Sequence, residues 1–196
     1  MKEKGKQEVF QALKMAPDDP QVILSAAQVY ASAEEFSKVV ELLQKCLESD
    51  QDIPSHLENS MYSLLARAVG KLGKTDEMLA WVNKGLKKSP RNKGLLWFVA
   101  NINLNLKRPV DVKRIIKRLE ELNYPPYLLS FLRGSIDFQQ GKWLAAARRM
   151  EKIQSLLFSQ QELYLRINRD LGRCYEVLGQ ADRQLESAGR ILSMQP

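Results

Sequence analysis

The chain has 196 residues, of which 44% are hydrophobic and 27% charged, and its formal net charge is +7. This composition is typical of a folded, mostly helical, soluble protein. No apolar run is long enough to span a bilayer and none follows the charged N-terminal residues, so neither a membrane span nor a signal peptide is expected. We expect a cytoplasmic location.

Apolar residues recur at helical spacing along the whole chain, in segments that are separated by turn residues. Residues 1–17 are expected to form one helix, the second half of a repeat whose first helix is missing. Because repeat arrays need polar caps at their ends, we expect a segment of a longer array or end-to-end self-association. A single solenoid domain is expected over residues 1–196. Its five antiparallel helix pairs are expected over residues 20–50, 55–90, 93–123, 127–158 and 162–196.

Several of these helices are expected to begin at recognisable signals. Ser55 and Glu58 have the spacing of a capping box, and Thr75 stands where it would cap the next helix. Pro109 suits the first turn of a helix, because its missing N–H would have had no partner there.

A recurring glycine sets the period of the chain. Gly73 and Gly141 are 68 residues apart, or two periods of about 34 residues, and Gly179 follows 38 residues later. Each glycine is expected at the turn inside a helix pair, where a helix must stop and reverse. The longer last spacing predicts about four additional residues near residues 155–160.

The residues around these glycines resemble the signature of the tetratricopeptide repeat family, and the resemblance covers nearly the whole chain. Glu34 and Lys107 stand where the family has glycine, so the first and third units are divergent. The resemblance implies an all-α fold, a right-handed α–α superhelix in which small residues let paired helices approach closely. The matching residues are Ala26, Ala27, Tyr30 and Phe36; Tyr62, Leu65, Ala66, Gly73 and Pro90; Gly134, Gly141, Trp143 and Ala146; and Leu171, Gly172, Tyr175, Gly179 and Pro196.

The resemblance also implies that the first helix of each pair lines a concave groove that binds a peptide segment of a partner protein. An acidic peptide with apolar anchors would suit the groove's arginines and aromatic residues. The alternative pairs the arginines with Asp170, Glu176 or Glu162 and packs the aromatic residues internally. Leu24 and Gln28 replace the residues of the family's carboxylate clamp, so recognition of chaperone tails is not expected. The expected groove residues are Arg67, Lys71, Trp97, Asn101, Asn105, Phe131, Ser135, Phe138, Arg166, Arg169 and Arg173.

The positive charge also suggests nucleic-acid binding through a basic convex face. A solvated face is the simpler interpretation, because cations near helix C-termini complement the helix dipole and no aromatic platform accompanies them. A third hypothesis is a regulatory or targeting region of a larger multidomain protein. The densest basic cluster comprises Lys107, Arg108, Lys113, Arg114, Lys117 and Arg118.

Catalytic chemistry has little support in the sequence, so we expect a non-enzymatic protein without cofactor or metal. His56 is the only histidine, and no cysteine or carboxylate set surrounds it at metal-ligand spacing. Cys46 and Cys174 fall on apolar helix faces and are expected to be reduced core residues, not a disulfide.

Overall fold

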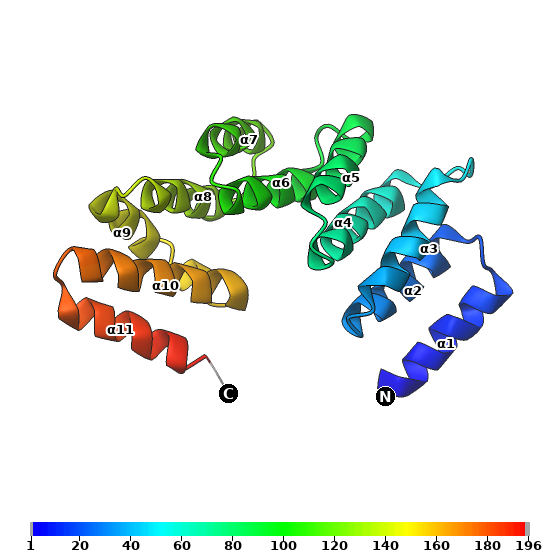
Figure 1. Cartoon of the computed structure of the whole chain (residues 1–196), viewed down its shortest axis with the longest axis horizontal. Helices are drawn as coiled ribbons and strands as arrows, with labels where there is room; N and C mark the ends of the chain where they lie inside the picture. The colour runs from blue at the N-terminus through cyan, green and yellow to red at the C-terminus, as the bar shows by residue number, and fades with distance from the viewer. Residues whose placement is uncertain (1, 195–196) are drawn as a thin grey trace. The chain divides into compact units, whose positions relative to one another are not determined.

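The computed structural model describes residues 2–194, and all regular elements in that range are helical (Figure 1). It divides into two compact units, Met1–Phe98 (unit 1) and Val99–Pro196 (unit 2), with the boundary inside α6. The single domain over residues 1–196 stays a prediction. The helices are α1 (Lys2–Met15), α2 (Pro20–Ser32), α3 (Phe36–Glu48), α4 (Ser55–Lys71), α5 (Thr75–Lys88), α6 (Lys93–Asn105), α7 (Pro109–Glu121), α8 (Pro126–Gln139), α9 (Trp143–Glu151), the 3₁₀ helix η1 (Ser155–Leu157), α10 (Gln161–Val177) and α11 (Ala181–Leu192).

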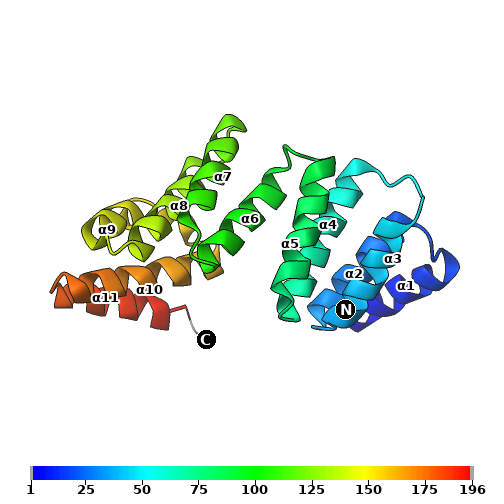
Figure 2. The same ribbon diagram turned by 45° about the horizontal axis from the view of Figure 1, so that its top comes forward.

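Each unit is built from helix pairs that stack on the next pair. In unit 1, α2 packs on α3 and α4 on α5, while α4 also contacts both helices of the preceding pair. In unit 2, α8 packs on α9 and α10 on α11, and α10 contacts both α8 and α9 (Figure 2). The helices fall within the ranges expected for the five pairs, apart from a one-residue earlier start of α8 and α10.

The irregular stretch before α10 lies where the glycine spacing placed it. Helix α9 is only nine residues long, and η1 follows it over Ser155–Leu157. Leu157 is fully buried in the core of unit 2, whereas its neighbours Leu156 and Phe158 are exposed.

The turns inside the helix pairs adopt left-handed backbone conformations. Gly73, Gly141 and Gly179 have φ angles of 78°, 71° and 68°. Glu34 and Lys107 take the same conformation, with φ angles of 60° and 54°. The two divergent units therefore keep the turn but place a residue with a Cβ in a region that favours glycine.

Small residues bring the two helices of a pair close together, as the resemblance implied. A Cβ built on Gly134 of α8 would lie 3.2 Å from Cγ of Met150 on α9. A Cβ on Gly172 of α10 would lie 3.7 Å from Cβ of Ser187 on α11. The first position is tighter than ordinary van der Waals contact, and the second has room for a methyl group.

Two of the expected helix caps are wrong. Helix α4 begins at Ser55 itself after Pro54, and α5 begins at Thr75, so neither hydroxyl occupies a capping position and neither helix has a side-chain cap. Glu58 pairs instead with Lys88 of α5. The expected position of Pro109 is correct, because it is the first residue of α7.

The cap of α2 is formed by an aspartate. The Asp19 carboxylate accepts hydrogen bonds from the backbone N–H groups of Gln21 at 2.8 Å and Val22 at 3.1 Å. These bonds satisfy two donors that the first turn of a helix otherwise leaves free.

Both cysteines lie in the cores of their units, as expected. Cys46 and Cys174 are buried free thiols, and burial raises the pKa of both, that of Cys174 to about 11. Within residues 2–194, none of the helices has the length and apolar character that crossing a membrane requires.

Candidate functional site

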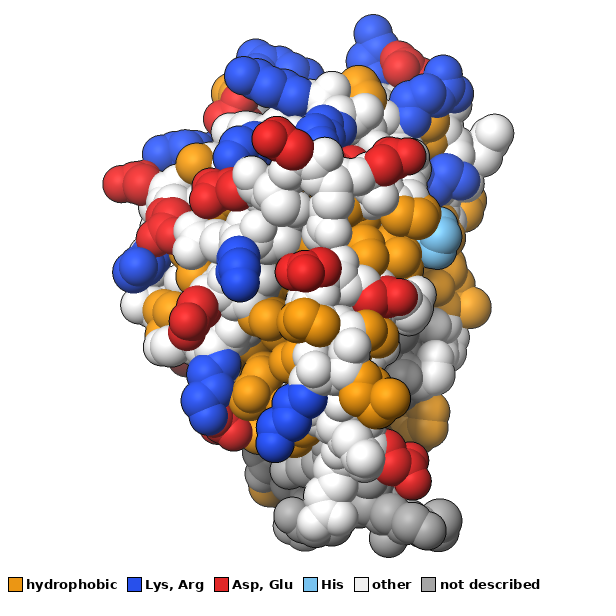
Figure 3. All heavy atoms as spheres, turned by 90° about the vertical axis from the view of Figure 1, so that its right-hand side faces the viewer, with side chains coloured by type: hydrophobic (Ala, Val, Ile, Leu, Met, Phe, Trp, Pro, Cys, Tyr) orange, Lys and Arg blue, Asp and Glu red, His pale blue; other side chains and the backbone are white. Residues whose placement is uncertain are grey.

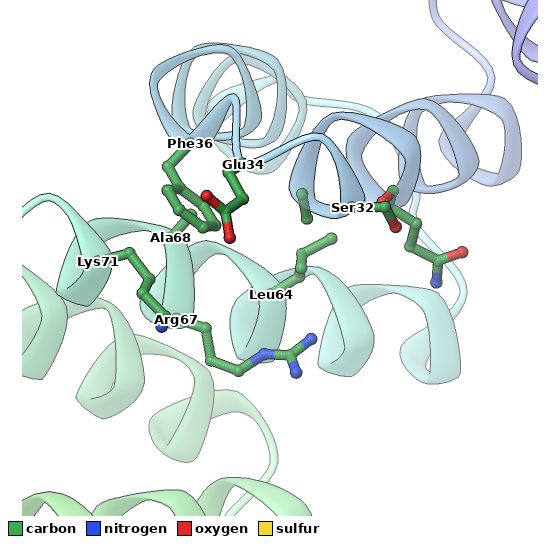
Figure 4. A pocket seen from close by; sticks show the side chains of 9 residues that line it. Ser32, Glu34, Phe36, Leu64, Arg67, Ala68 and Lys71 are labelled. Atoms are coloured by element: carbon green, nitrogen blue, oxygen red, sulfur yellow. The ribbon is translucent and has the colours of Figure 1, made fainter. Parts of the chain in front are cut away.

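Unit 1 carries an open hollow, the α4 hollow, where the end of α2 and the turn after it face α4. Its volume is about 440 Å³, and α4 contributes a row of side chains to one wall (Figure 4). The residues that line it are Gln28, Ala31, Ser32, Glu34, Phe36, Leu64, Arg67, Ala68 and Lys71.

Two cations of the α4 hollow share one face of α4. Arg67 and Lys71 are four residues apart, which places them one turn apart on the helix. Both side chains are exposed, and neither forms an ion pair within the described residues. Glu34 is the one carboxylate that lines the hollow. The α4 hollow therefore presents two positive charges against one negative charge.

Apolar side chains also line the α4 hollow. Leu64 is 5% exposed and Phe36 is half-buried, and both line the hollow beside the two cations. Figure 4 shows Phe36 beside Glu34, across from Arg67 and Lys71 on α4. A ligand here would meet charge and apolar surface side by side.

Unit 2 carries a second open hollow, the α10 hollow, with a volume of about 510 Å³. Helix α10 provides most of it, and Asn105 at the end of α6 completes it. The lining residues are Asn105, Glu162, Leu165, Arg166, Arg169 and Asp170.

The arginines of the α10 hollow are held in different ways. The Arg166 guanidinium carbon lies 5.4 Å from the centre of the Phe131 ring, a cation–π contact with α8. Arg169 is exposed, and neither it nor Arg166 forms an ion pair in the part of the chain that the structure describes. Burial raises the pKa of the Asp170 carboxyl to about 6, although both arginines act to lower it.

Several other predicted groove residues lie below the surface. Phe131 is 0% and Ser135 1% exposed, so the expectation that both face a ligand is corrected. Phe131 lies beneath Arg166, and Ser135 Oγ is buried with no hydrogen-bond partner among the described residues. Phe138 is half-buried and makes an edge contact with Trp143, their ring centres 5.4 Å apart.

The last three predicted positions differ from one another. Arg173 pairs with Glu176 at 2.6 Å, as the alternative interpretation held, and lies outside the α10 hollow. Trp97 and Asn101 are half-buried on α6, on different sides of the unit boundary, and line neither hollow.

Sequence reasoning missed Phe36 and Glu34 as site residues, because it assigned the groove to first helices alone. Phe36 begins the second helix of its pair, and Glu34 lies in the turn before it. The left-handed φ of Glu34 belongs to a turn that the missing glycine had already marked.

Basic residues on α7 are only partly neutralised. Arg114 pairs with Asp111 at 3.4 Å, while Lys113 and Lys117 are exposed and make no ion pair within the described range.

Figure 3 shows the face of the molecule that lies on the right-hand side of Figure 1. On this face basic, acidic and apolar side chains are interspersed, so the positive charge does not form a continuous area there.

No group of three or more potential metal ligands gathers anywhere within residues 2–194. His56 is an exposed residue in the first turn of α4.

Comparison with known sequences finds no match, either to a family model or to a curated protein. Comparison with solved structures finds matches. A tetratricopeptide repeat protein from Parabacteroides merdae is 11% identical, with a TM-score of 0.73 over 97% of this chain and 72% of that one. The Cut9–Hcn1 hetero-tetramer of the APC/C gives a TM-score of 0.77 at 14% identity, over 99% of this chain and 38% of that one.

A third similar structure is IFIT1 in complex with the capped RNA m7Gppp-AAAA. Its TM-score is 0.66 at 15% identity, and the match covers 100% of this chain and 47% of that one. These identities are low, and the likeness lies in the arrangement of the helices. The chain has the all-α helical-repeat fold of tetratricopeptide repeat proteins.

Proposed function

We propose that this chain is a non-enzymatic scaffold that binds a peptide segment of a partner protein, and that the segment carries acidic and apolar side chains. The observation that carries the proposal is the α4 hollow, where Arg67 and Lys71 stand beside Phe36 and Leu64. A helical-repeat fold supports it, because stacked repeats present extended surfaces that bind other chains.

The chemistry of the α4 hollow suits such a segment. An arginine guanidinium accommodates a carboxylate through two parallel hydrogen bonds, and a lysine adds a mobile positive charge. Phe36 offers half-buried aromatic surface against which an apolar side chain loses contact with water. The similar structure of Cut9 in complex with Hcn1 supports a protein as the partner class.

The test is a selection from a random peptide library on the intact chain. We expect enriched peptides that combine Asp or Glu with a bulky apolar residue. The double variant Arg67→Glu, Lys71→Glu should bind these peptides at least about tenfold more weakly, because it places two negative charges beside the ligand's carboxylates.

A matched control carries the same charge change elsewhere in unit 1. Lys87→Glu with Arg91→Glu changes two exposed cations that do not line the α4 hollow. This control should bind as the unmodified chain does. Equal loss in both variants would mean that net charge, not the α4 hollow, drives binding, and enrichment of peptides without acidic residues would contradict the proposal.

Nucleic-acid binding is the second candidate, and the exposed, unpaired Lys113 and Lys117 on α7 favour it. The similar structure of IFIT1 with capped RNA supports that class of ligand for this fold. If α7 contacts phosphates, Lys113→Glu with Lys117→Glu should weaken retention of a fluorescent single-stranded RNA and reduce its salt dependence. Retention that is unchanged by this variant would remove α7 from consideration.

A further inference from the structure

The α10 hollow contains opposite charges on a single helix face. Arg166, Arg169 and Asp170 are separated by three and one residues along α10, and all three side chains line the same space. Its volume of about 510 Å³ lies within the usual range of ligand pockets, roughly 300–1,000 Å³.

One of the two guanidinium groups is already positioned. Arg166 stacks on Phe131, whose ring is completely buried and therefore fixed by the core of unit 2. A fixed guanidinium loses less conformational entropy when it binds a carboxylate than a mobile one does. Asn105 of α6 adds a side-chain amide to the same lining.

The negative charge of Asp170, which opposes the arginine charges in the α10 hollow, is disfavoured by burial. Asp170 is half-buried, and burial opposes its ionised form strongly enough to raise its pKa to about 6. The charges that act on it are those of Arg166 and Arg169, and the buried thiol of Cys174 lies near enough for its own pKa to be raised by Asp170.

Other charges around α10 are engaged elsewhere or are exposed. Glu162 lines the hollow and is exposed. The charged pairs of the packed helices α8, α9 and α11 are Arg133 with Glu120 of α7, Asp137 with Arg149, Glu151 with Arg183, and Glu186 with Arg190. Asp170 is half-buried and forms no ion pair within the described residues.

We propose that the α10 hollow binds a carboxylate group of the partner segment, which takes the place of the Asp170 charge beside Arg166 and Arg169. The inference rests on the proposed function and specifies the chemistry of a second contact. Two carboxylates that share one hollow repel each other, and the lower-energy state places a proton on the buried one. Binding is accordingly coupled to proton uptake by Asp170.

This coupling has a definite sign. Above about pH 6 Asp170 is ionised and neutralises part of the arginine charge, so a ligand carboxylate binds weakly. Below that pH Asp170 is neutral and the same ligand binds more tightly. Asp170→Asn removes the competing charge at every pH, so we expect the variant to bind tightly throughout and without this pH dependence.

The experiment uses a probe with a single carboxylate, N-acetylglutamate α-amide, and its neutral counterpart, N-acetylglutamine α-amide. Binding to the full chain is followed by NMR through the side-chain Nε–H signals of Arg166 and Arg169, at about pH 5.5 and about pH 7.5. The probe carboxylate stays ionised at both values. We expect only the charged probe to shift these signals, with affinity higher at the lower pH by on the order of tenfold.

Variants complete the experiment. Asp170→Asn should bind the charged probe equally at both pH values, whereas the control Asp182→Asn, at an exposed position on α11, should keep the pH dependence. In Arg166→Gln with Arg169→Gln, the charged probe should no longer shift the side-chain amide signals of Asn105, another residue that lines the α10 hollow, while the helical circular dichroism is unchanged. Equal affinity at both pH values in the unmodified chain, or an equal response to the neutral probe, would overturn the inference.

The outcome is separable from that for the proposed function. If the probe does not bind but selected peptides still depend on Arg67 and Lys71, the α10 hollow is no carboxylate site and the scaffold proposal stands. If the probe binds as expected and no peptide is selected, the failure belongs to the proposed function.

Discussion

The Tyr175 hydroxyl donates a 2.7 Å hydrogen bond to Oε1 of Glu151 and thereby joins α10 to the end of α9. Arg183 of α11 contacts the same carboxylate oxygen at 3.1 Å, and its guanidinium lies over the Tyr175 ring. Burial, reinforced by the bond to Glu151, raises the pKa of Tyr175 well above its ordinary value. Side chains of α9, α10 and α11 therefore meet at one carboxylate.

Replacing this tyrosine tests how much the shared carboxylate contributes to stability. Tyr175→Phe keeps the ring and removes the donor, so we expect a loss of about 1.5–3 kcal/mol in the free energy of unfolding, typical of a hydrogen bond to a charged group. Chemical denaturation measures it. The control Tyr127→Phe removes a hydroxyl that accepts a 3.0 Å bond from neutral Gln160 and should cost less.

At the left-handed turns, substitution to glycine should stabilise the chain and substitution of glycine should destabilise it. Lys107→Gly and Glu34→Gly should each stabilise the chain by about 1 kcal/mol, because glycine adopts positive φ without a Cβ penalty. Gly179→Ala should destabilise it by a similar amount through the backbone alone, because a Cβ there meets no atom within 4 Å. Thermal unfolding of the three variants measures these effects. A neutral Lys107→Gly would show that the turn carries no strain.

Gly85 and Gly172 differ in how closely other residues approach them. A Cβ on Gly85 would lie 2.9 Å from both Leu95 Cδ1 and Tyr62 Cγ, so Gly85→Ala should cost about 1–3 kcal/mol. Gly172→Ala has room at 3.7 Å from Ser187 and should gain up to about 1 kcal/mol from helix propensity. Urea unfolding of both variants tests the difference, and the same sign of change in both would contradict it.

The raised pKa of Asp170 has its own consequence for stability. The carboxyl releases its proton near pH 6 in the folded chain and near its ordinary value of about 3.9 in the unfolded chain. Between these values the folded state holds the additional proton, so the stability contributed by Asp170 is lost as the pH rises through about 6.

Asp170→Asn isolates this effect. The variant should be more stable than the unmodified chain near pH 8, with an advantage that shrinks as the pH falls below about 6. Urea unfolding across this range measures it, with Asp182→Asn as the exposed control. An advantage that does not change with pH would assign the effect to packing and not to charge.

The sequence predicts much of the fold for physical reasons that are local. Helical periodicity and turn chemistry are properties of short segments, so the helix pairs, the turns at Gly73, Gly141 and Gly179 and the irregular stretch near Ser155 were all predictable. The caps at Ser55 and Thr75 failed because each helix begins one residue earlier than the motif implied, a shift that hydrophobic periodicity cannot resolve.

The candidate site was less predictable, since burial depends on neighbouring helices. Periodicity indicates which side of α8 Phe131 occupies, but not that Arg166 of another helix lies across its ring. Phe36 lines the α4 hollow at the start of α3, a helix that packs on α4 and follows the turn at Glu34. Such contacts join residues that are about 30 positions apart, and the sequence pattern contains no record of them.

The open turn at Gly179 also has a practical consequence. Nothing within 4 Å would meet an atom added at this position, and both flanking helices end or begin there. Gly179 does not line the α10 hollow. A short reporter loop inserted at this turn would add length where the chain already reverses direction. Unit 2 thus offers an attachment point for a reporter that leaves the lining of the α10 hollow unchanged.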